Sequence, residues 1–306
     1  MTPLQRYIAE EIATDHADGL LSRREAMRRL ALLGVGTAAA SALITACSHQ
    51  KSAPPPAASS EMITTPPGST QPPGMADALP TEPISWPGPQ GELHAAWAQA
   101  ASPRGGVLVV HENKGLNDWV RSVAGRLAGA GYSALAIDLL SEEGGTDTFR
   151  DPAEATAALG KVPPERFTHD LNSGVAQLRV RVPGTKVAVV GFCFGGGLVW
   201  QLLTSGALAV SAAVPFYGPL PDNPDFAGSK AAVLAIYAAL DSRVTTGSQA
   251  AAKAALDAAG LVNDIVVEPN ADHAFFNDTG PHYNAAAAAD AWQRLLDWFA
   301  RYLTAP

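Results

Sequence analysis

The chain has 306 residues, of which 47% are hydrophobic and 16% charged, and this balance excludes a coiled coil, a collagen and a wholly disordered chain. Its net charge is −8, and its 21 basic residues form no stripe of the kind that binds nucleic acid. The two cysteines, Cys47 and Cys193, allow at most one disulfide, which a chain of this length does not need in order to fold. We therefore expect a globular protein in which each cysteine has its own role.

Residues 1–47 have the layout of a signal segment. Arginines between positions 23 and 29 precede an uncharged apolar run from Leu30 to Ala46. The run is short and rich in small residues, so a permanent transmembrane anchor is the less favoured interpretation. We expect an exported protein, periplasmic or at the outer cell surface, that meets the membrane only through this leader or through a lipid anchor.

Two short motifs refine this expectation. Ser22-Arg23-Arg24 is similar to the twin-arginine export signal, although Ala26 stands where that signal usually has a large apolar residue. Ile44-Thr45-Ala46-Cys47 resembles a lipobox, in which the cysteine is lipid-modified and becomes the new N-terminus. The alternative is an ordinary cleavage site with a coincidental cysteine. The lipobox makes Cys47 a candidate for lipidation.

The next segment, residues 48–78, is predicted to be a disordered tether. Between positions 51 and 90 the chain places 11 of its 24 prolines, with few apolar side chains before about Met75. Such a stretch cannot bury enough apolar surface to offset the entropy of folding. The folded domain is expected to span residues 79–306, which is the size of a single domain.

This domain alternates apolar strands with helical segments. The predicted strands are short runs rich in β-branched residues, at 106–111, 132–138, 186–191, 210–217, 232–239 and 264–268. Predicted helices lie at 117–130, 246–259 and 285–302. This alternation predicts an α/β fold with a mostly parallel, doubly wound sheet covered by helices on both faces. Sites in such sheets lie at the carboxyl ends of the strands.

The strongest chemical motif runs from Gly191 to Gly197 and has the form Gly-x-Cys-x-Gly. It joins a predicted strand to a helix that is expected to begin near Gly196. In this nucleophile elbow a strained turn pushes the central side chain out of the sheet, while glycines let strand and helix approach closely. Cys193 is therefore a candidate nucleophile. The alternative, a small buried hydrophobe, does not account for the flanking glycines.

A thiol nucleophile needs a base, and an acid to orient that base. His273 lies in a loop after the last predicted strand, with His282 as the rival. Asp241 ends an earlier strand, where a helix N-cap is the alternative role. The order Cys193, Asp241, His273 is the nucleophile, acid, histidine order of α/β-hydrolases, so we expect these three to form a catalytic triad.

The loop after the first predicted parallel strand completes the candidate site. Backbone N–H groups of Asn113 and Phe194 are the expected oxyanion-hole donors. Glu112 is expected beside Cys193, where its carboxylate would oppose thiolate formation and could also take the thiol's proton.

These motifs resemble those of the dienelactone hydrolase family, within the α/β-hydrolase superfamily. The matching stretches are His111 to Leu116, Gly191 to Gly196, Asp241 in Leu-Asp-x-Arg, and His273 in Asp-His-Ala-Phe. The resemblance implies hydrolysis of an enol-lactone or related small ester through a thioester, with no metal or organic cofactor, and a glutamate like Glu112 that relays the thiol's proton.

One position departs from the family pattern. Enzymes of the family bind the substrate carboxylate with arginines, one of them four residues after the catalytic histidine, where this chain has Asn277. Arg166 is a loose candidate for the second arginine. Two other kinds of protein are alternatives to an enzyme of this family. A non-catalytic tethered α/β-hydrolase-fold binding module predicts a broken triad, and a thiol redox protein requires a second reactive cysteine, which is missing. The expected partner is a small ester or lactone.

Overall fold

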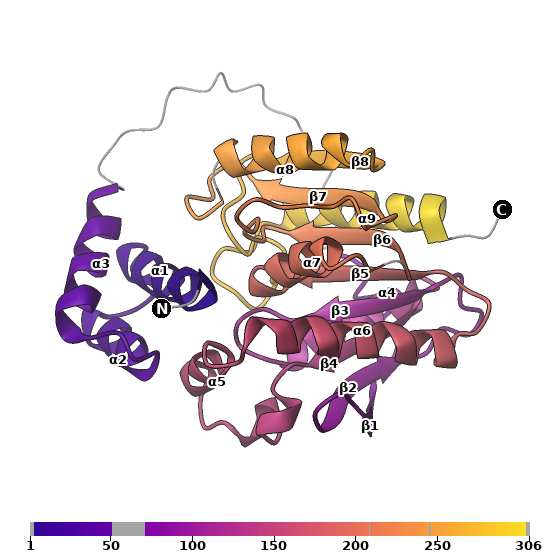
Figure 1. Cartoon of the computed structure of the whole chain (residues 1–306), viewed down its shortest axis with the longest axis horizontal. Coiled ribbons are helices and arrows are strands. Elements are labelled where there is room, and N and C mark those ends of the chain that lie inside the picture. The colour runs from indigo at the N-terminus through magenta and orange to yellow at the C-terminus, as the bar shows by residue number, and fades with distance from the viewer. Residues whose placement is uncertain (1–2, 51–70, 208, 245, 304–306) are drawn as a thin grey trace.

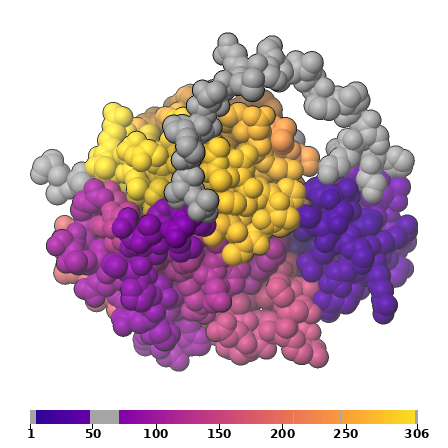
Figure 2. Space-filling model, turned by 180° about the vertical axis from the view of Figure 1, so that it is seen from behind, coloured from indigo at the N-terminus to yellow at the C-terminus, as the bar shows by residue number. Residues whose placement is uncertain are grey.

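The computed structural model describes residues 3–50, 71–207, 209–244 and 246–303. Figure 1 shows two parts: a body built on one large sheet, and a lobe of three N-terminal helices against one end of that body. The same lobe lies directly against the body in the space-filling view from behind (Figure 2).

The sheet of the body has eight strands in the order β1-β2-β4-β3-β5-β6-β7-β8. β1 pairs with β2, and β2 with β4, in antiparallel fashion, while the remaining pairs are parallel. The strands are β1 Glu82–Pro87, β2 Glu92–Ala98, β3 Gly106–Val110, β4 Ser133–Asp138, β5 Val187–Phe192, β6 Val210–Phe216, β7 Ala232–Ala238 and β8 Asn263–Glu268.

Helices cover both faces of this sheet. The helix pair α4 and α9 lies on one face, and α6 and α7 lie on the other (Figure 1). The helices of the body are α4 Asp118–Gly129, α5 Pro152–Leu159, α6 Pro164–Arg181, α7 Phe194–Thr204, α8 Thr246–Ala258 and α9 Ala285–Leu303, with short 3₁₀ turns at Ser141–Glu143 and Thr146–Thr148. The expected α/β-hydrolase fold, with a mostly parallel sheet covered on both faces, is confirmed.

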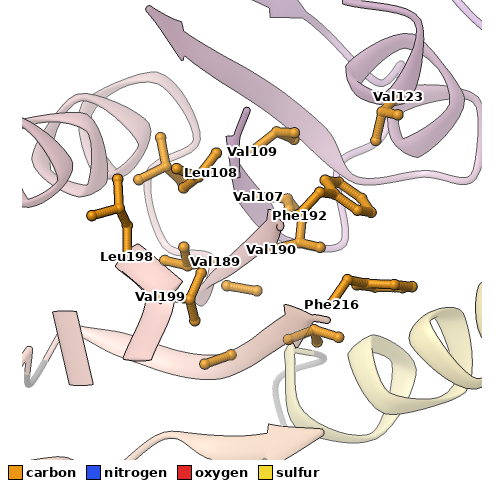
Figure 3. Packing of buried hydrophobic residues seen from close by; sticks show 14 of the residues in the cluster. Val107, Leu108, Val109, Val123, Val189, Val190, Phe192, Leu198, Val199 and Phe216 are labelled. Carbon is orange, nitrogen blue, oxygen red and sulfur yellow. The ribbon is translucent and has the colours of Figure 1, made fainter. Parts of the chain in front are cut away.

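The core lies where the central parallel strands meet these helices. All five residues of β3 and all six of β5 are buried. Because both faces of a parallel sheet are covered, its strands carry apolar side chains at successive positions instead of alternating ones. Figure 3 shows Val109 of β3, Val190 of β5 and Phe216 of β6 packed into this interior.

The six predicted parallel strands and the three predicted helices are all present. The antiparallel strands β1 and β2 and the helices α5 and α6 were not predicted from the sequence. β1 alternates poorly and is mostly exposed, so it carries a weak hydrophobic pattern. The elbow helix begins at Phe194, two residues before the expected Gly196, and Cys193 is its N-cap residue.

The N-terminal lobe consists of α1 Pro3–Ala17, α2 Arg23–Leu32 and α3 Thr37–Gln50. Its helices share a small apolar core of their own, to which the body contributes Ala157 of α5. The sequence predicts a leader over residues 1–47, and in the structure the described part of this segment, from residue 3 on, packs against the body. In the part of the chain that is described, none of the helices is both long and apolar enough to cross a membrane.

Most of the predicted tether, 48–78, lies outside the described residues. Its last part, 71–78, is described and lies against the body, which differs from an extended tether that reaches residue 78. A side chain at Gly129 of α4 would collide with the carbonyl oxygen of Asp77, and any side chain at Gly74 would press on Trp292 of α9. The body therefore includes residues that precede the expected start at 79, because this stretch has backbone and side-chain partners on α4 and α9.

Candidate active site

The predicted catalytic side chains come from loops at the carboxyl ends of four parallel strands. Glu112 follows β3, Cys193 follows β5, Asp241 follows β7 and His273 follows β8. Parallel strands end at one edge of a sheet, so residues far apart in sequence meet there. All four side chains are buried in the structure.

The backbone at Cys193 has the geometry of a strained elbow. Its φ is +56°, a conformation that a residue with a side chain seldom adopts. Its amide donates to the carbonyl of Phe216, and its carbonyl accepts from Gly197 in the first turn of α7. A Cβ at position 195 would collide with the carbonyl oxygens of Val110 and His111. The glycine there lets α7 approach β3 closely enough to hold the turn.

His273 and Asp241 form a buried pair. The Nδ1 atom of His273 lies 2.7 Å from Oδ2 of Asp241, and the other Asp241 oxygen accepts from the amides of Arg243 at 2.8 Å and Val244 at 3.3 Å. Burial disfavours both the imidazolium form of His273 and the carboxylate form of Asp241. The pair's mutual attraction outweighs burial, so the pKa of His273 is raised and that of Asp241 is lowered. With Nδ1 bound to Asp241, Nε2 has no hydrogen-bond partner among the described residues.

Cys193 lies beside this imidazole. Its Sγ atom, a ring nitrogen of His273 and a carboxylate oxygen of Glu11 all lie within 4.8 Å of one another. The sulfur also lies 3.2 Å from the hydroxyl of Tyr7 and 3.5 Å from Oε1 of Glu11. Burial, followed by the charges of Glu11 and Glu112, raises the pKa of the thiol well above its usual value. In this state the sulfur is a thiol rather than a thiolate at neutral pH.

Glu112 lies near enough to Cys193 for its charge to disfavour the thiolate, as expected, and its hydrogen bond is to another residue. Its Oε2 atom accepts a hydrogen bond of 2.8 Å from the side-chain amide of Asn277. The carboxylate that is hydrogen-bonded to the thiol is that of Glu11, not Glu112. Burial raises the pKa of Glu112, against the opposing effects of Lys114 and Asn277. Asn277, where the family pattern has an arginine, therefore fixes this carboxyl group.

The two expected oxyanion-hole residues also lie at this edge. The backbone N–H of Phe194, in the first turn of α7, lowers the pKa of the Cys193 thiol against the larger effects of burial and of the two carboxylates. Asn113 donates from its side chain to Oε2 of Glu11 at 2.8 Å, while its carbonyl accepts from Thr156. The Asn113 loop is thus fixed between α5 of the body and α1 of the lobe.

Two other candidates have different surroundings. His282, the rival base, lies 3.4 Å from Asp272 and is paired with it, whereas Asp241 is paired with His273. Arg166, the loose candidate for carboxylate binding, is buried and bonded to Glu143 at 2.7 Å. Its guanidinium also donates to the Leu139 carbonyl, so it is part of a structural network rather than the site.

Cys47, the lipidation candidate, is a half-buried free thiol on α3. It lines a cavity of about 340 Å³ together with Tyr7, Glu11 and Arg243. Both cysteines are therefore free, and no disulfide joins them in the described structure.

Within the described ranges, two groups of side chains have the ligand types and spacing of a metal site. One consists of Glu11, Cys193 and His273, and it coincides with the candidate active site. The other consists of Asp18, Asp272 and His282.

Tyr7 and Glu11 are the site residues that sequence reasoning missed. They are separated from Cys193 by 186 and 182 positions, so no local motif connects them. The spacing of four between Tyr7, Glu11 and Asp15 indicates one face of a helix, but it does not reveal which surface that face covers.

Comparison with known proteins shows the family to which the chain is similar. The model of the dienelactone hydrolase family matches residues 93–303. A protein of Escherichia coli O157:H7 named "Putative carboxymethylenebutenolidase" is 34% identical over 248 residues, covering 77% of this chain and 87% of its own. One of the same name from Methylorubrum extorquens is 36% identical over 209 residues, covering 64% of this chain and 72% of its own.

Solved structures give the same result. A "Putative Dienelactone Hydrolase" from Klebsiella pneumoniae superposes with a TM-score of 0.63 at 31% identity, covering 72% of this chain and 98% of its own. An acylaminoacyl peptidase from Pyrococcus horikoshii has a TM-score of 0.57 at 15% identity, covering 75% of this chain and 42% of its own, which is a likeness of fold alone.

Proposed function

The chain belongs to the dienelactone hydrolase family, and from this premise we propose that it hydrolyses a small ester or lactone, such as an enol-lactone, through a thioester on Cys193. One observation carries the proposal: a cysteine at a strained elbow lies beside an imidazole whose far nitrogen is held by a buried aspartate at 2.7 Å. This is the arrangement that nucleophilic acyl transfer requires.

The proposed first half-reaction forms the thioester. Nε2 of His273 takes the proton of the thiol, and the thiolate attacks the carbonyl carbon of the substrate. The bond from that carbon to the alkoxy oxygen then breaks, and the leaving oxygen takes the proton from the imidazolium. Asp241 keeps the imidazole in the required tautomer and stabilises its charge.

In the second half-reaction water replaces the leaving group. His273 takes a proton from water, the hydroxide attacks the thioester carbon, and the carbon–sulfur bond breaks to release the acid and restore the thiol. The N–H groups of Phe194 and Asn113 are the proposed donors to the oxyanion in both halves. Residues of the chain supply every group this reaction needs, so the proposal includes no metal or organic cofactor.

We assign Glu112 the role of a relay in the first half-reaction: it takes the proton of the thiol and passes it to Nε2 of His273. Burial raises the pKa of Glu112, so this carboxyl group accepts a proton more readily than a carboxylate exposed to water. The hydrogen bond from Asn277 fixes its orientation. Glu112→Gln is expected to lower kcat about tenfold or more with little change in KM, measured by steady-state kinetics. An unchanged kcat would remove Glu112 from the mechanism.

The substrate class depends on whether the site can bind a carboxylate group of the substrate. The position four residues after His273 holds Asn277, which is bonded to Glu112 and has no positive charge. Arg166 is bonded to acidic residues of its own structural network. Neither side chain is placed to bind a substrate carboxylate, so short uncharged esters and lactones belong in the first set of test compounds beside dienelactone.

We also propose that the protein is exported and held at the membrane through Cys47. The support is the sequence alone, namely the arginine cluster, the apolar run and the lipobox-like end of that run. Cell fractionation of Cys47→Ser beside the unchanged protein tests this. Movement from the membrane to the soluble fraction is expected, and an unchanged distribution would contradict lipid anchoring.

The direct test of the proposed function is hydrolysis of short aryl esters and of dienelactone by the full chain, beside Cys193→Ala. Activity that depends on Cys193 is the expected result, together with a mass increase of one acyl group on that residue after rapid quenching with acid. Equal hydrolysis by both proteins would contradict the thiol mechanism. Binding without hydrolysis would favour a non-catalytic module.

A further inference from the structure

Helix α1 lies across the opening of the candidate active site. Cys193 is 2% exposed and His273 is 3% exposed, so the proposed nucleophile and base have almost no contact with solvent. A substrate cannot reach them in this arrangement. Figure 1 shows α1, in indigo, on the side of the N-terminal lobe that faces the body.

One face of α1 supplies the covering contacts. Tyr7, Glu11 and Asp15 follow each other at intervals of four, so their side chains line one side of the helix. Tyr7 lies 3.2 Å from the Cys193 sulfur, and Asp15 accepts from Arg243 at 2.6 Å. Each contact joins α1 to a loop that also carries a proposed catalytic residue.

Glu11 occupies the centre of this face. One of its carboxylate oxygens accepts from the thiol of Cys193 at 3.5 Å, and the other accepts from the Asn113 side chain at 2.8 Å. An acyl group of a bound ester would need this space between the nucleophile and the loop of Asn113. Glu11 therefore fills the position that a substrate must take.

The space on either side of α1 supports this interpretation. A cavity of about 340 Å³ and a groove of about 470 Å³ lie next to the site, and Tyr7 and Arg243 belong to the walls of both. The groove continues over Phe194 and Leu198 at the start of α7. Removal of the Tyr7 side chain would join the two spaces directly beside Cys193, which is the size and place expected of a substrate pocket.

The covering helix also opposes activation of the thiol. The carboxylate of Glu11 adds negative charge next to Cys193, so together with burial it raises the pKa of that thiol. The groups that face this pair from the neighbouring elements are Tyr7, Asp15, Glu112, Lys114, Asp241, Arg243 and His273. Displacement of α1 would remove the charge of Glu11 and admit water, and both changes favour the thiolate.

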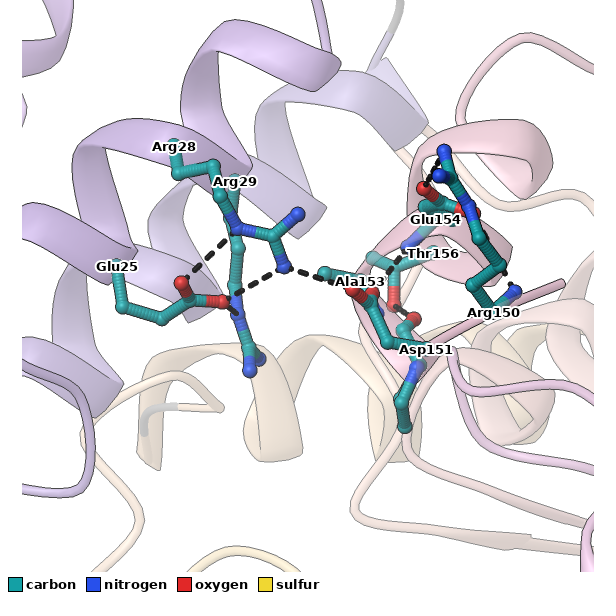
Figure 4. Close-up of polar contacts among 9 residues, drawn as sticks. Glu25, Arg28, Arg29, Arg150, Asp151, Ala153, Glu154 and Thr156 are labelled. Atoms are coloured by element: carbon teal, nitrogen blue, oxygen red, sulfur yellow. Dashed lines mark hydrogen bonds and ion pairs between the residues drawn. The ribbon is translucent and has the colours of Figure 1, made fainter.

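The lobe is attached to the body by few apolar contacts. Its apolar core lies mainly within the lobe, and Ala157 is the body's residue in that core. Figure 4 shows the polar contact between α2 and the start of α5, where Arg28 donates to Asp151 at 3.0 Å. The side chain of Arg28 is 42% exposed, and an ion pair so open to solvent contributes little. The stronger contacts are polar and belong to α1, where Asp15 accepts from the buried Arg243 at 2.6 Å. Release of the lobe must break these contacts, but it leaves the apolar core of the body in place.

We propose that the N-terminal lobe is an intramolecular cover that shields Cys193 most of the time and keeps turnover by the full chain slow, with Tyr7 and Glu11 in the place of substrate, and that its release exposes Cys193. This inference rests on the proposed function of Cys193 for its biological meaning, but its test does not use an ester. Cleavage before Cys47, as the lipobox predicts, would remove α1 and α2 and so release the cover permanently.

The test measures alkylation of Cys193 by iodoacetamide in the full chain carrying Cys47→Ser, so that one thiol remains. Ile8→Asp with Ile12→Asp places charges in the lobe's apolar core and leaves every residue of the body unchanged. We expect this release variant to be alkylated at least about tenfold faster, because alkylation follows the population of the open state. Val180→Asp, on an exposed residue of α6, is the control and should keep the original rate.

A milder variant covers the case in which the release variant does not fold. Glu11→Gln keeps the size of the side chain and removes its charge, and it is expected to raise the alkylation rate severalfold near neutral pH. Glu10→Gln makes the same change one residue away, on an exposed side chain, and should have no effect.

The outcomes separate the two proposals. Equal alkylation rates in the original and release variants, with loss of helical signal showing that the lobe has opened, would overturn the cover. Faster alkylation without any ester hydrolysis would support the cover and contradict the proposed hydrolase. If ester hydrolysis depends on Cys193 but release of the lobe leaves the alkylation rate unchanged, the hydrolase is supported and the cover is contradicted.

Discussion

At Cys193 the backbone conformation favours formation of the thiolate, whereas the surroundings of the side chain disfavour it. The elbow directs the sulfur to His273 and to the N–H of Phe194, which favours a reactive thiolate. Burial and the carboxylates of Glu11 and Glu112 disfavour the same thiolate. The thiol is thus correctly placed and unreactive in one state, and the change that activates it must alter its surroundings rather than its position.

The role of Asp241 can be tested without removing the imidazole. Asp241→Asn keeps the size of the side chain, but it loses the charge that orients and stabilises His273. We expect kcat for an aryl ester to fall by about 10³–10⁴-fold, with KM nearly unchanged, in steady-state kinetics of the variant. Asp272→Asn, on the partner of His282, is the matched control and should retain most of the activity. The opposite pattern would assign the base to His282.

Residues of the site differ in how far the sequence predicted them. Cys193, Asp241 and His273 were predicted because each lies in a short motif at a strand end, and the structure brings them together. Tyr7 and Glu11 were not predicted, since their contact with Cys193 depends on how a separate lobe packs. Similarly, the bond between Asn277 and Glu112 joins two loops that follow different strands.

Among the elements, the junction of β5 and α7 determines where the nucleophile lies. Any side chain at position 195 would push α7 away from the carbonyls at the end of β3. Continuous apolar runs predicted the parallel strands well, because burial on both faces requires such runs. The edge strand β1 is mostly exposed and lacks that requirement, and the packing of the N-terminal helices depends on contacts that no local pattern encodes.

Gly195→Ala tests this junction. The added methyl group meets two backbone carbonyls, which cannot move independently, so we expect a loss of about 2–4 kcal/mol in the free energy of unfolding. Urea denaturation measures the change. Gly36→Ala adds the same group where no atom lies within 4 Å, and it should change stability little. Equal free energies of unfolding for Gly195→Ala and Gly36→Ala would contradict the close approach of α7 to the end of β3.

The end of β8 provides a pH-dependent test. Burial, followed by the charge of Asp290 on α9, raises the pKa of Glu268 to about 7. The folded state therefore binds a proton that the unfolded state has already lost, and stability should fall as pH rises from about 4.5 to about 7. Glu268→Gln removes this fall.

The expected result is a variant that is more stable than the original protein by about 1 kcal/mol at about pH 8, with the difference lost near pH 4. Thermal or urea unfolding across this pH range measures it. Glu165→Gln, on an exposed side chain of α6, serves as the control and should show no such trend. If the stability difference between Glu268→Gln and the original protein were the same at all pH values, the raised pKa of Glu268 would be contradicted.

On the scale of the whole molecule, the chain combines a body of the dienelactone hydrolase family with an N-terminal lobe whose helix α1 contacts Cys193. The lobe coincides with the segment predicted from sequence to be a leader, residues 1–47. The two interpretations are compatible, because a leader that covers the thiol would keep the protein unreactive until the leader is removed or displaced. We propose this link between export and activation as the reason why α1 carries Tyr7 and Glu11.

The central claim is that Cys193 is a nucleophile that the lobe covers. The most direct measurement is hydrolysis of a short aryl ester by three full-length proteins: the original chain, the chain with Ile8→Asp and Ile12→Asp, and that same release variant with Cys193→Ala. We predict slow turnover by the first, turnover at least about tenfold faster by the second, and none by the third. Equal turnover by the second and third proteins would contradict the claim.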